Sequence, residues 1–190
     1  MTITILPYSP HWPVQFAEIA RSLRDALGGL ALRIDHIGST AVPGLPAKEI
    51  LDLQITVQAL DAAVETVLQR AGYNRLPHIT CDHVPPGGSD DSQDWEKWFF
   101  QPATTPPAIN LHVRVLGRAN QRYPLLFRDY LRAHPLVAAA YAQTKFALMR
   151  YHADDLTAYC DIKDPVCDVI IAAAEAWAVA IDWQPSPTEG

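Results

Sequence analysis

The chain has 190 residues, of which 49% are hydrophobic and 19% are charged. This composition is that of an ordinary soluble globular protein, large enough for one well-filled core or two small subdomains. The formal net charge of −6 argues against binding to extended nucleic acid through bulk electrostatics, although it is compatible with a local basic pocket.

No segment is predicted to cross a membrane or to direct secretion. The most apolar stretch, residues 166–181, is interrupted by Asp168 and Glu175 and is too short to span a bilayer. The first residues lack both a positively charged region and a long apolar region, so we expect no signal peptide. Three cysteines without a C-x-x-C pair indicate free thiols in a reducing compartment. We therefore expect a cytoplasmic protein.

Strands and helices alternate in the first part of the chain. Residues 2–6 alternate β-branched side chains and predict a short strand. Ser9-Pro10 predicts a helix start, with the hydroxyl as N-cap and the proline at the first helical position, and Gly28-Gly29 ends that helix. Further strands are predicted at 32–36, 50–57, 78–84, 95–100 and 109–116, a helix at about 60–71, and a long loop at 85–92.

From residue 120 onward the pattern is helical. Helices are predicted at 123–133, 136–150 and 165–181, with residues 156–163 between the last two, followed by a polar tail. Strands first and helices last predict an α+β fold with a mixed sheet, flanking helices and a C-terminal helical segment. We expect a core over 1–118, a helical segment packed on it over 119–183, and a flexible tail over 184–190.

Residues 33–54 are the best candidate for a binding site. A predicted strand ends in Gly38-Ser39, a loop follows, and the next strand presents the isolated acid Asp52. Small residues let backbone N–H groups approach a phosphate closely, and the Ser39 hydroxyl adds one hydrogen bond. Asp52 could hold Mg²⁺ against that phosphate. The structural alternatives are an ordinary turn at Gly38-Ser39 and an ion pair of Asp52 with Lys48 or Lys97.

Polar residues occupy one face of two predicted strands. Alternation places Asp52 beside Gln54 on one strand, and His112 beside Arg114 on the other. If these strands are neighbours, Asp52, Gln54 and His112 form a cluster. The carbonyl oxygen of the Gln54 side chain could be a weak ligand of a metal ion. His112 could be a general base, a metal ligand, a hydrogen-bond donor to phosphate, or a satisfied histidine of a half-buried strand.

Other residues of the chain could bind a metal ion or an anion. His36 with Asp52 and His112 would suit a transition metal better than Mg²⁺, whereas His78, Cys81 and His83 lack a zinc spacing and are discounted. The cations expected to converge on the candidate site are Lys48, Lys97, Arg114, Arg128, Arg132, Lys145 and Lys163. Lys145, on an alanine-rich helix, is the favoured phosphate contact, while a structural ion-pair network explains Arg128 and Arg132 equally well.

Several of these motifs together resemble the GrpB-like family, which is also found fused to some dephospho-coenzyme A kinases. The resemblance lies in HIGSTAVPGL at 36–45, Ala47-Lys48 and LDLQ at 51–54, with further matches at 8–12, 110–113, 127–132, Tyr141 with Lys145, and Tyr159 with Lys163. It implies a nucleotidyltransferase-like fold, whose superfamily pattern is Gly-Ser followed by Asp-x-Asp or Asp-x-Glu and a third carboxylate on a later strand. Here Gln54 and His112 stand at the second and third acidic positions.

Three functional hypotheses follow. In the first, Gly38, Ser39 and Thr40 hold the phosphates of a nucleoside triphosphate, Asp52 and Gln54 bind Mg²⁺, and His112 orients or deprotonates the acceptor. Lys48, Arg114 and Lys145 would neutralise the phosphate charge. In the second, the same pocket binds a nucleotide or other phosphorylated small molecule without turnover. In the third, the chain is an interaction domain whose helical segment docks a partner. The sequence leaves the oligomeric state open.

Overall fold

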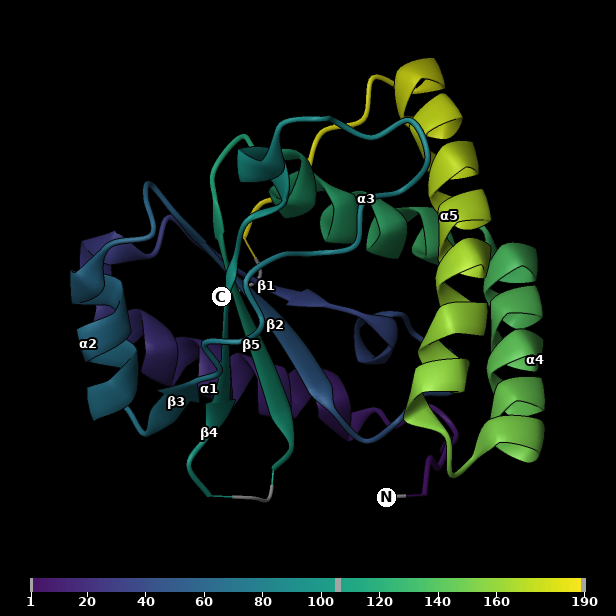
Figure 1. Cartoon of the computed structure of the whole chain (residues 1–190), viewed down its shortest axis with the longest axis horizontal. Coiled ribbons are helices and arrows are strands. Elements are labelled where there is room, and N and C mark those ends of the chain that lie inside the picture. Colours follow the sequence, from purple (N-terminus) through teal and green to yellow (C-terminus); the bar gives the residue numbers. More distant parts are fainter. Residues whose placement is uncertain (1, 105–106, 189–190) are drawn as a thin grey trace.

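The computed structural model describes residues 2–104 and 107–188, which form a five-stranded mixed sheet flanked by helices (Figure 1). The strand order is β1-β2-β5-β4-β3, with β2 and β5 parallel and the other pairs antiparallel. The strands are β1 (Arg33–Ile37), β2 (Leu51–Val57), β3 (Tyr73–Arg75), β4 (Trp98–Pro102) and β5 (Ile109–Val115). The predicted α+β architecture is confirmed.

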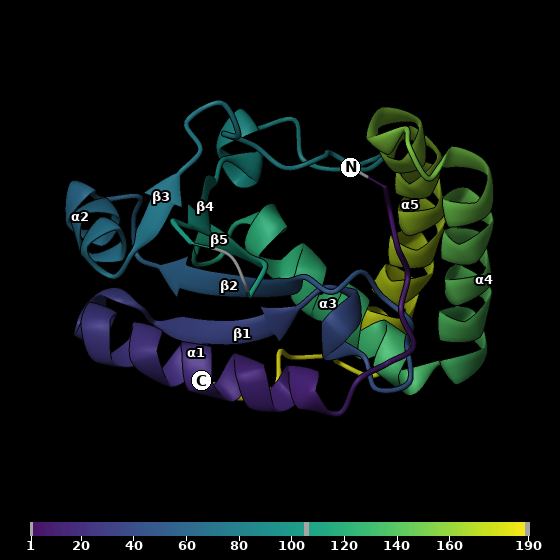
Figure 2. The same ribbon diagram turned by 90° about the horizontal axis from the view of Figure 1, so that it is seen from below.

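Helices α1 (His11–Leu27) and α2 (Ala62–Arg70) cover one face of the sheet. Figure 2 shows α1 running along β1 and β2, with the loop before β4 on the other side of the sheet. The apolar residues of α1, at helical spacing, pack on the alternate residues Leu51, Leu53 and Ile55 of β2. Because that face of β2 is apolar, the residues between, Asp52 and Gln54, point to the opposite face.

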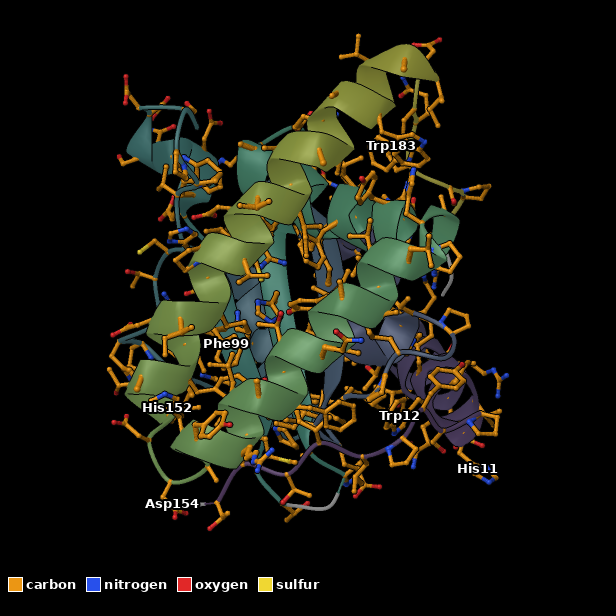
Figure 3. The ribbon with its side chains drawn as sticks, turned by 90° about the vertical axis from the view of Figure 1, so that its right-hand side faces the viewer. His11, Trp12, Phe99, His152, Asp154 and Trp183 are labelled. Carbon is orange, nitrogen blue, oxygen red and sulfur yellow. The ribbon has the colours of Figure 1, made fainter. Side chains whose placement is uncertain are left out.

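The second half of the chain forms a separate helical layer around α3 (Ala119–Ala133), α4 (Pro135–His152) and α5 (Leu156–Ala180). Figure 3 looks onto α4 and α5, which lie side by side with the strands behind them. Leu126, Tyr141 and Ile171 belong to one buried apolar cluster of these helices, and Val42 and Leu45 from the loop between β1 and β2 join it. The loop after Gly38 is thereby fixed between the sheet and the helices.

Parallel pairing of β2 with β5 brings the two polar faces together. Asp52 is in register with Asn110, and Gln54 with His112. The prediction that these two strands are neighbours is therefore confirmed. Their pairing creates one continuous polar surface on the side of the sheet away from α1.

Two predicted strands are wrong because no strand runs beside them. Residues 2–6 make only the single bridge from Leu6 to Ala47, and they pack Ile3 and Ile5 against α4 and α5. Residues 78–84 make only the bridge from Cys81 to Glu96. The short strand β3 was not predicted; it pairs with β4 after the turn at Gly72.

Several helix boundaries also differ from the prediction: α3 begins at Ala119, four residues earlier than expected, and α5 begins at Leu156, nine residues earlier. Helix α1 begins at His11, one residue later than expected, with Pro10 at the N-cap and the Ser9 hydroxyl accepting a hydrogen bond from the His11 N–H at 3.3 Å. Helix α5 runs through Pro165 without ending, although proline removes one backbone donor. Packing on both sides of Pro165, at Tyr159 and at Ile170, keeps the two halves in one helix.

The tail after α5 returns to the edge strand β1. Thr188 Oγ1 accepts a hydrogen bond from the Ile34 N–H at 3.1 Å and donates one to the Ile34 carbonyl at 2.9 Å. Residues 189–190, the end of the predicted flexible tail, lie outside the described residues. Within the part of the chain that the structure describes, no helix is both long and apolar enough to cross a membrane.

Candidate functional site

Two cavities meet at the end of β1, on the polar side of the sheet. The first, about 240 Å³, is called the lysine cavity because Lys48, Lys145 and Lys163 line it together with Ser39. The second, about 280 Å³, is called the aromatic cavity because Trp95, Tyr123 and Phe127 line it together with Asp82 and Asn120. Gly38, Asp52 and Lys163 line both cavities, so the predicted Gly-Ser bend and the isolated acid stand at their junction.

Gly38 is required by its contact with Asp52. Its φ of +72° lies in the region that favours glycine, and a Cβ at this position would lie 3.0 Å from Asp52 Cγ and overlap the carboxylate oxygen Oδ2. The absence of a side chain therefore lets the backbone of the bend approach the acid closely. The prediction that these two groups meet is borne out by this contact.

Two residues of β5 hold one oxygen of the Asp52 carboxylate. Asn110 Nδ2 donates a hydrogen bond to Asp52 Oδ1 at 2.9 Å, and His112 Nε2 lies 3.8 Å from the same atom. Burial raises the pKa of Asp52, but His112, Asn110 and the charge of Lys48 outweigh it and hold the pKa below its usual value. Asp52 is therefore an ionised carboxylate, with its other oxygen, Oδ2, facing Gly38.

His112 is a neutral histidine whose proton is on Nε2. Its Nδ1 faces two donors, Arg114 Nη2 at 3.1 Å and Lys97 Nζ at 3.4 Å, so this nitrogen must be the acceptor. Burial, and then the charge of Arg114, lower the pKa of His112 to about 4. The geometry does not support the predicted general base, because Nδ1 is occupied and Nε2 already carries a proton directed at Asp52.

Gln54 and Arg114 form a hydrogen bond with each other. Gln54 is fully buried; its Oε1 accepts from Arg114 Nη1 at 2.8 Å, and its Nε2 donates to the Gln121 carbonyl at 2.9 Å. The Gln54 oxygen that the sequence assigns to a metal ion is thus engaged by a guanidinium, which does not favour a metal ion there. Arg114, 4% exposed, is likewise not the free phosphate contact we expected.

Asp82 is one of the site residues that the sequence did not reveal. It accepts from Arg114 Nε at 2.8 Å and from Lys97 Nζ at 2.6 Å, and Asn120 Nδ2 donates to it at 3.1 Å. Burial raises the pKa of Asp82, but Arg114 and Lys97 lower it well below its usual range. Lys97, one of the two alternative ion-pair partners considered for Asp52, is thus paired with Asp82 instead. No local motif marks this acid, since Arg114 is distant in the sequence.

Lys145 reaches the Gly-Ser bend as expected. Its Nζ donates to Ser39 Oγ at 3.1 Å and also to the Pro46 carbonyl, and the side chain is nearly buried. Burial lowers the pKa of Lys145 to about 7, and the nearby charges of Lys163 and Lys48 add to this effect. Lys48 stands over the Tyr159 ring, 5.4 Å from its centroid. Three lysines from three different segments therefore converge on the lysine cavity.

The other candidate residues have structural roles. The Thr40 hydroxyl is bonded to His36 Nε2 at 2.9 Å, so it does not contact phosphate in this conformation. His36 stacks on Phe16 of α1, on the face of the sheet opposite Asp52, which rules out the His36-Asp52-His112 metal set. Arg128 donates to the His36 carbonyl and Arg132 to the Ala41 carbonyl, so both tie α3 to the bend.

The residues present do not fit a two-metal centre. Asp52 is the carboxylate that lies at the Gly38 bend, and the neighbouring Gln54 oxygen is bonded to a guanidinium. Two-metal phosphoryl transfer relies on several carboxylates to hold both ions. In residues 2–104 and 107–188, no group of three His, Cys, Asp or Glu side chains is arranged to hold a metal ion.

The mixed five-stranded sheet with its flanking helices is shared with solved structures. The structure of the GLD-2/RNP-8 complex matches 77% of this chain and 56% of its own chain with a TM-score of 0.51 at 12% identity, which is a likeness of fold alone. The crystal structure of the conserved protein GrpB from Enterococcus faecalis covers 92% of this chain and 99% of its own, with a TM-score of 0.75 and 26% identity.

The chain belongs to the GrpB family, whose family model, described as GrpB protein, matches residues 2–173. It is 35% identical to UPF0157 protein BH1888 of Halalkalibacterium halodurans, over 92% of this chain and 84% of that protein. It is also 38% identical to a dephospho-CoA kinase of Mycolicibacterium paratuberculosis, over 96% of this chain. The chain spans about half the length of that relative, 48%.

Proposed function

We propose that this chain binds a phosphorylated small molecule, with a nucleotide as the favoured ligand and its phosphates in the lysine cavity. The observation that supports this most is the convergence of Lys48, Lys145 and Lys163 with the Ser39 hydroxyl on one cavity of a protein whose net charge is negative. Ammonium groups in a partly enclosed cavity attract anions strongly because solvent screens them less there.

The aromatic cavity suits the non-phosphate part of such a ligand. Tyr123 and Phe127 are stacked with their ring centroids 6.1 Å apart, and Trp95 lines the same cavity. A planar base can pack on aromatic rings of this kind. Because both cavities share Gly38, Asp52 and Lys163, one ligand can place its phosphates in the lysine cavity and its base among the aromatic side chains.

The pocket is proposed to bind its ligand without nucleotidyl transfer. Gln54 is engaged by Arg114, and His112 is protonated on the nitrogen that faces Asp52. Neither Gln54 nor His112 therefore supplies the second acid or the free base that the transfer hypothesis needs. The dephospho-CoA kinase name of some relatives concerns those longer proteins, and it agrees with a phosphorylated ligand for the present domain.

Isothermal titration calorimetry with ATP, ADP and pyrophosphate tests this proposal. We expect binding to the wild-type chain and at least a tenfold loss in Lys145→Met. Arg21→Met is the matched control, because Arg21 is an exposed cation on α1, away from both cavities, and we expect no change for it. Absence of binding by all three compounds, or equal binding by Lys145→Met, would contradict the proposal. Release of pyrophosphate from ATP, abolished in Asp52→Ala, would instead favour a transferase.

A further inference from the structure

We propose that the ligand binds as a free phosphate ester, without a divalent metal ion, because the protein's own cations supply the neutralising charge. This inference rests on the proposed function and identifies the form of the ligand that the site takes. It also departs from the usual chemistry of the fold, in which a carboxylate cluster holds the ions that accompany a nucleotide.

Arg114 occupies the place next to Asp52 where a second acid would hold an ion. Asp52 and Gln54 lie side by side on the polar face of β2, and the Gln54 oxygen is 2.8 Å from Arg114 Nη1. Asp82 fixes this guanidinium with two further bonds, at 2.8 and 2.9 Å. A positive charge is thus built into the sheet at this point, and a divalent ion there would be repelled by it.

Asp52 alone offers a poor cation site. Asn110 and His112 both face Oδ1, so Oδ2 is the oxygen left for another partner. Mg²⁺ requires near-octahedral coordination, usually with one or two carboxylates plus phosphate oxygens and water. The next oxygen along β2 belongs to Gln54, which is buried and engaged. A single carboxylate oxygen beside a fixed guanidinium therefore gives an ion little to bind.

The lysine cavity favours the metal-free ligand on electrostatic grounds. Lys48, Lys145 and Lys163 line it together with Asp52, and Lys163 Nζ is paired with Asp164 Oδ1 at 2.6 Å. Positive side chains therefore outnumber negative ones here when Lys145 is protonated. A phosphate chain that carries Mg²⁺ has lost two negative charges, and its oxygens are partly covered by the ion. Lysines and magnesium consequently compete for the same oxygens, and the free phosphate should be the tighter ligand.

Calorimetry of ATP and pyrophosphate in EDTA and in excess Mg²⁺ tests this inference. We expect affinity in EDTA to equal or exceed that in Mg²⁺. A tenfold or greater gain of affinity on adding Mg²⁺ would overturn the inference while leaving phosphate binding, and hence the proposed function, intact. No binding in either buffer would overturn the proposed function and this inference together.

Asp52→Asn provides a second, independent test, because its effect on ATP affinity differs between metal-dependent and metal-free binding. If Asp52 carried a metal ion, its loss would weaken ATP binding in Mg²⁺ by tenfold or more, which would overturn the inference. If the ligand binds metal-free, removing a negative charge beside the phosphates leaves binding equal or tighter. Circular dichroism and the unfolding midpoint check that the variant is folded, and Asn110→Asp, which adds a carboxylate at the register partner of Asp52, should weaken binding in EDTA.

Discussion

At the scale of single residues, the site depends on how closely Gly38 approaches Asp52. The sequence predicts that Gly38 lets the backbone approach a phosphate, but in the structure Gly38 contacts the carboxylate of Asp52 on the next strand. Glycine is required at this position for two reasons. It adopts the positive φ of the bend without strain, and it leaves room for the Asp52 carboxylate.

Replacing Gly38 by alanine should destabilise the fold by about 2 kcal/mol or more, because the backbone conformation is strained for any other residue and the Cβ overlaps the carboxylate. Urea denaturation measures the change in the free energy of unfolding. Gly29→Ala is the matched control, since a Cβ there meets no atom within 4 Å, and a change of equal size in both variants would contradict this explanation.

The pH dependence of ligand binding should report the protonation of Lys145. Its pKa is lowered to about 7 in the folded chain, mainly by burial, so the ammonium is present below that pH and lost above it. Binding an anion favours the ammonium form, so wild-type affinity for ADP should fall by about fivefold relative to that of Lys145→Met between about pH 6 and 8.5. Parallel pH profiles of the two proteins, measured by calorimetry, would contradict this assignment.

At the scale of elements, an ion pair and a hydrogen bond fix the long loop that precedes β4. Asp82 binds Arg114 of β5, and His83 Nε2 lies 3.0 Å from Asp168 Oδ1 of α5. These contacts attach the loop both to the sheet and to the helical layer, so that Trp95 closes one side of the aromatic cavity. The proline- and glycine-rich loop predicted at 85–92 therefore follows directly on a segment that is attached to both layers.

Asp82→Asn should destabilise the chain by about 3 kcal/mol, because Arg114 and Lys97 stay buried without their counter-charge. The pKa of Asp82 is lowered on folding, so its contribution to stability is present above the ordinary carboxyl pKa of about 3.9 and is lost as the pH falls below it. Urea unfolding at neutral and acidic pH measures both effects. A variant as stable as the wild type at neutral pH would show that the pairing contributes nothing.

The alternating pattern in the sequence predicted much of this site, and its limits have a physical cause. Period-2 spacing placed Asp52 and Gln54 on one face, and parallel pairing then brought His112 beside them, as expected. Spacing carries no information on which partner a buried side chain finds across the fold. Asp82 therefore went unrecognised, and Gln54 and Arg114 were assigned to a ligand although they bind each other.

The edge strand β1 is covered by groups from distant segments. Thr188 bonds both polar groups of Ile34, and Arg128 of α3 donates to the His36 carbonyl at 2.9 Å. An open strand edge is a template for pairing with another chain. The tail thus closes an edge that would otherwise be available for association.

Deleting residues 184–190 should expose this edge and promote association. We expect light scattering to give a larger mean mass for the shortened chain than for the full chain at equal concentration. Thr188→Val keeps the size of the side chain but removes both hydrogen bonds to Ile34, and should show a smaller effect in the same direction. An unchanged mass for the shortened chain would contradict the proposed protection.

At the scale of the whole molecule, the site lies where the sheet meets the helical layer. The bend after β1 comes from the sheet, Lys145 from α4 and Lys163 from α5, so the cavity exists only when both layers are assembled. The sequence predicted the two layers and their order, but the convergence of the lysines depends on how α4 and α5 pack, which periodicity does not encode.

A crystal structure of the chain with ADP would show directly where the phosphates bind. We expect density for the β-phosphate in the lysine cavity, within hydrogen-bond distance of Ser39 Oγ and Lys145 Nζ, and the adenine ring beside Tyr123 and Phe127. Phosphates bound at any other surface, or an empty lysine cavity at saturating ADP, would contradict the proposed binding.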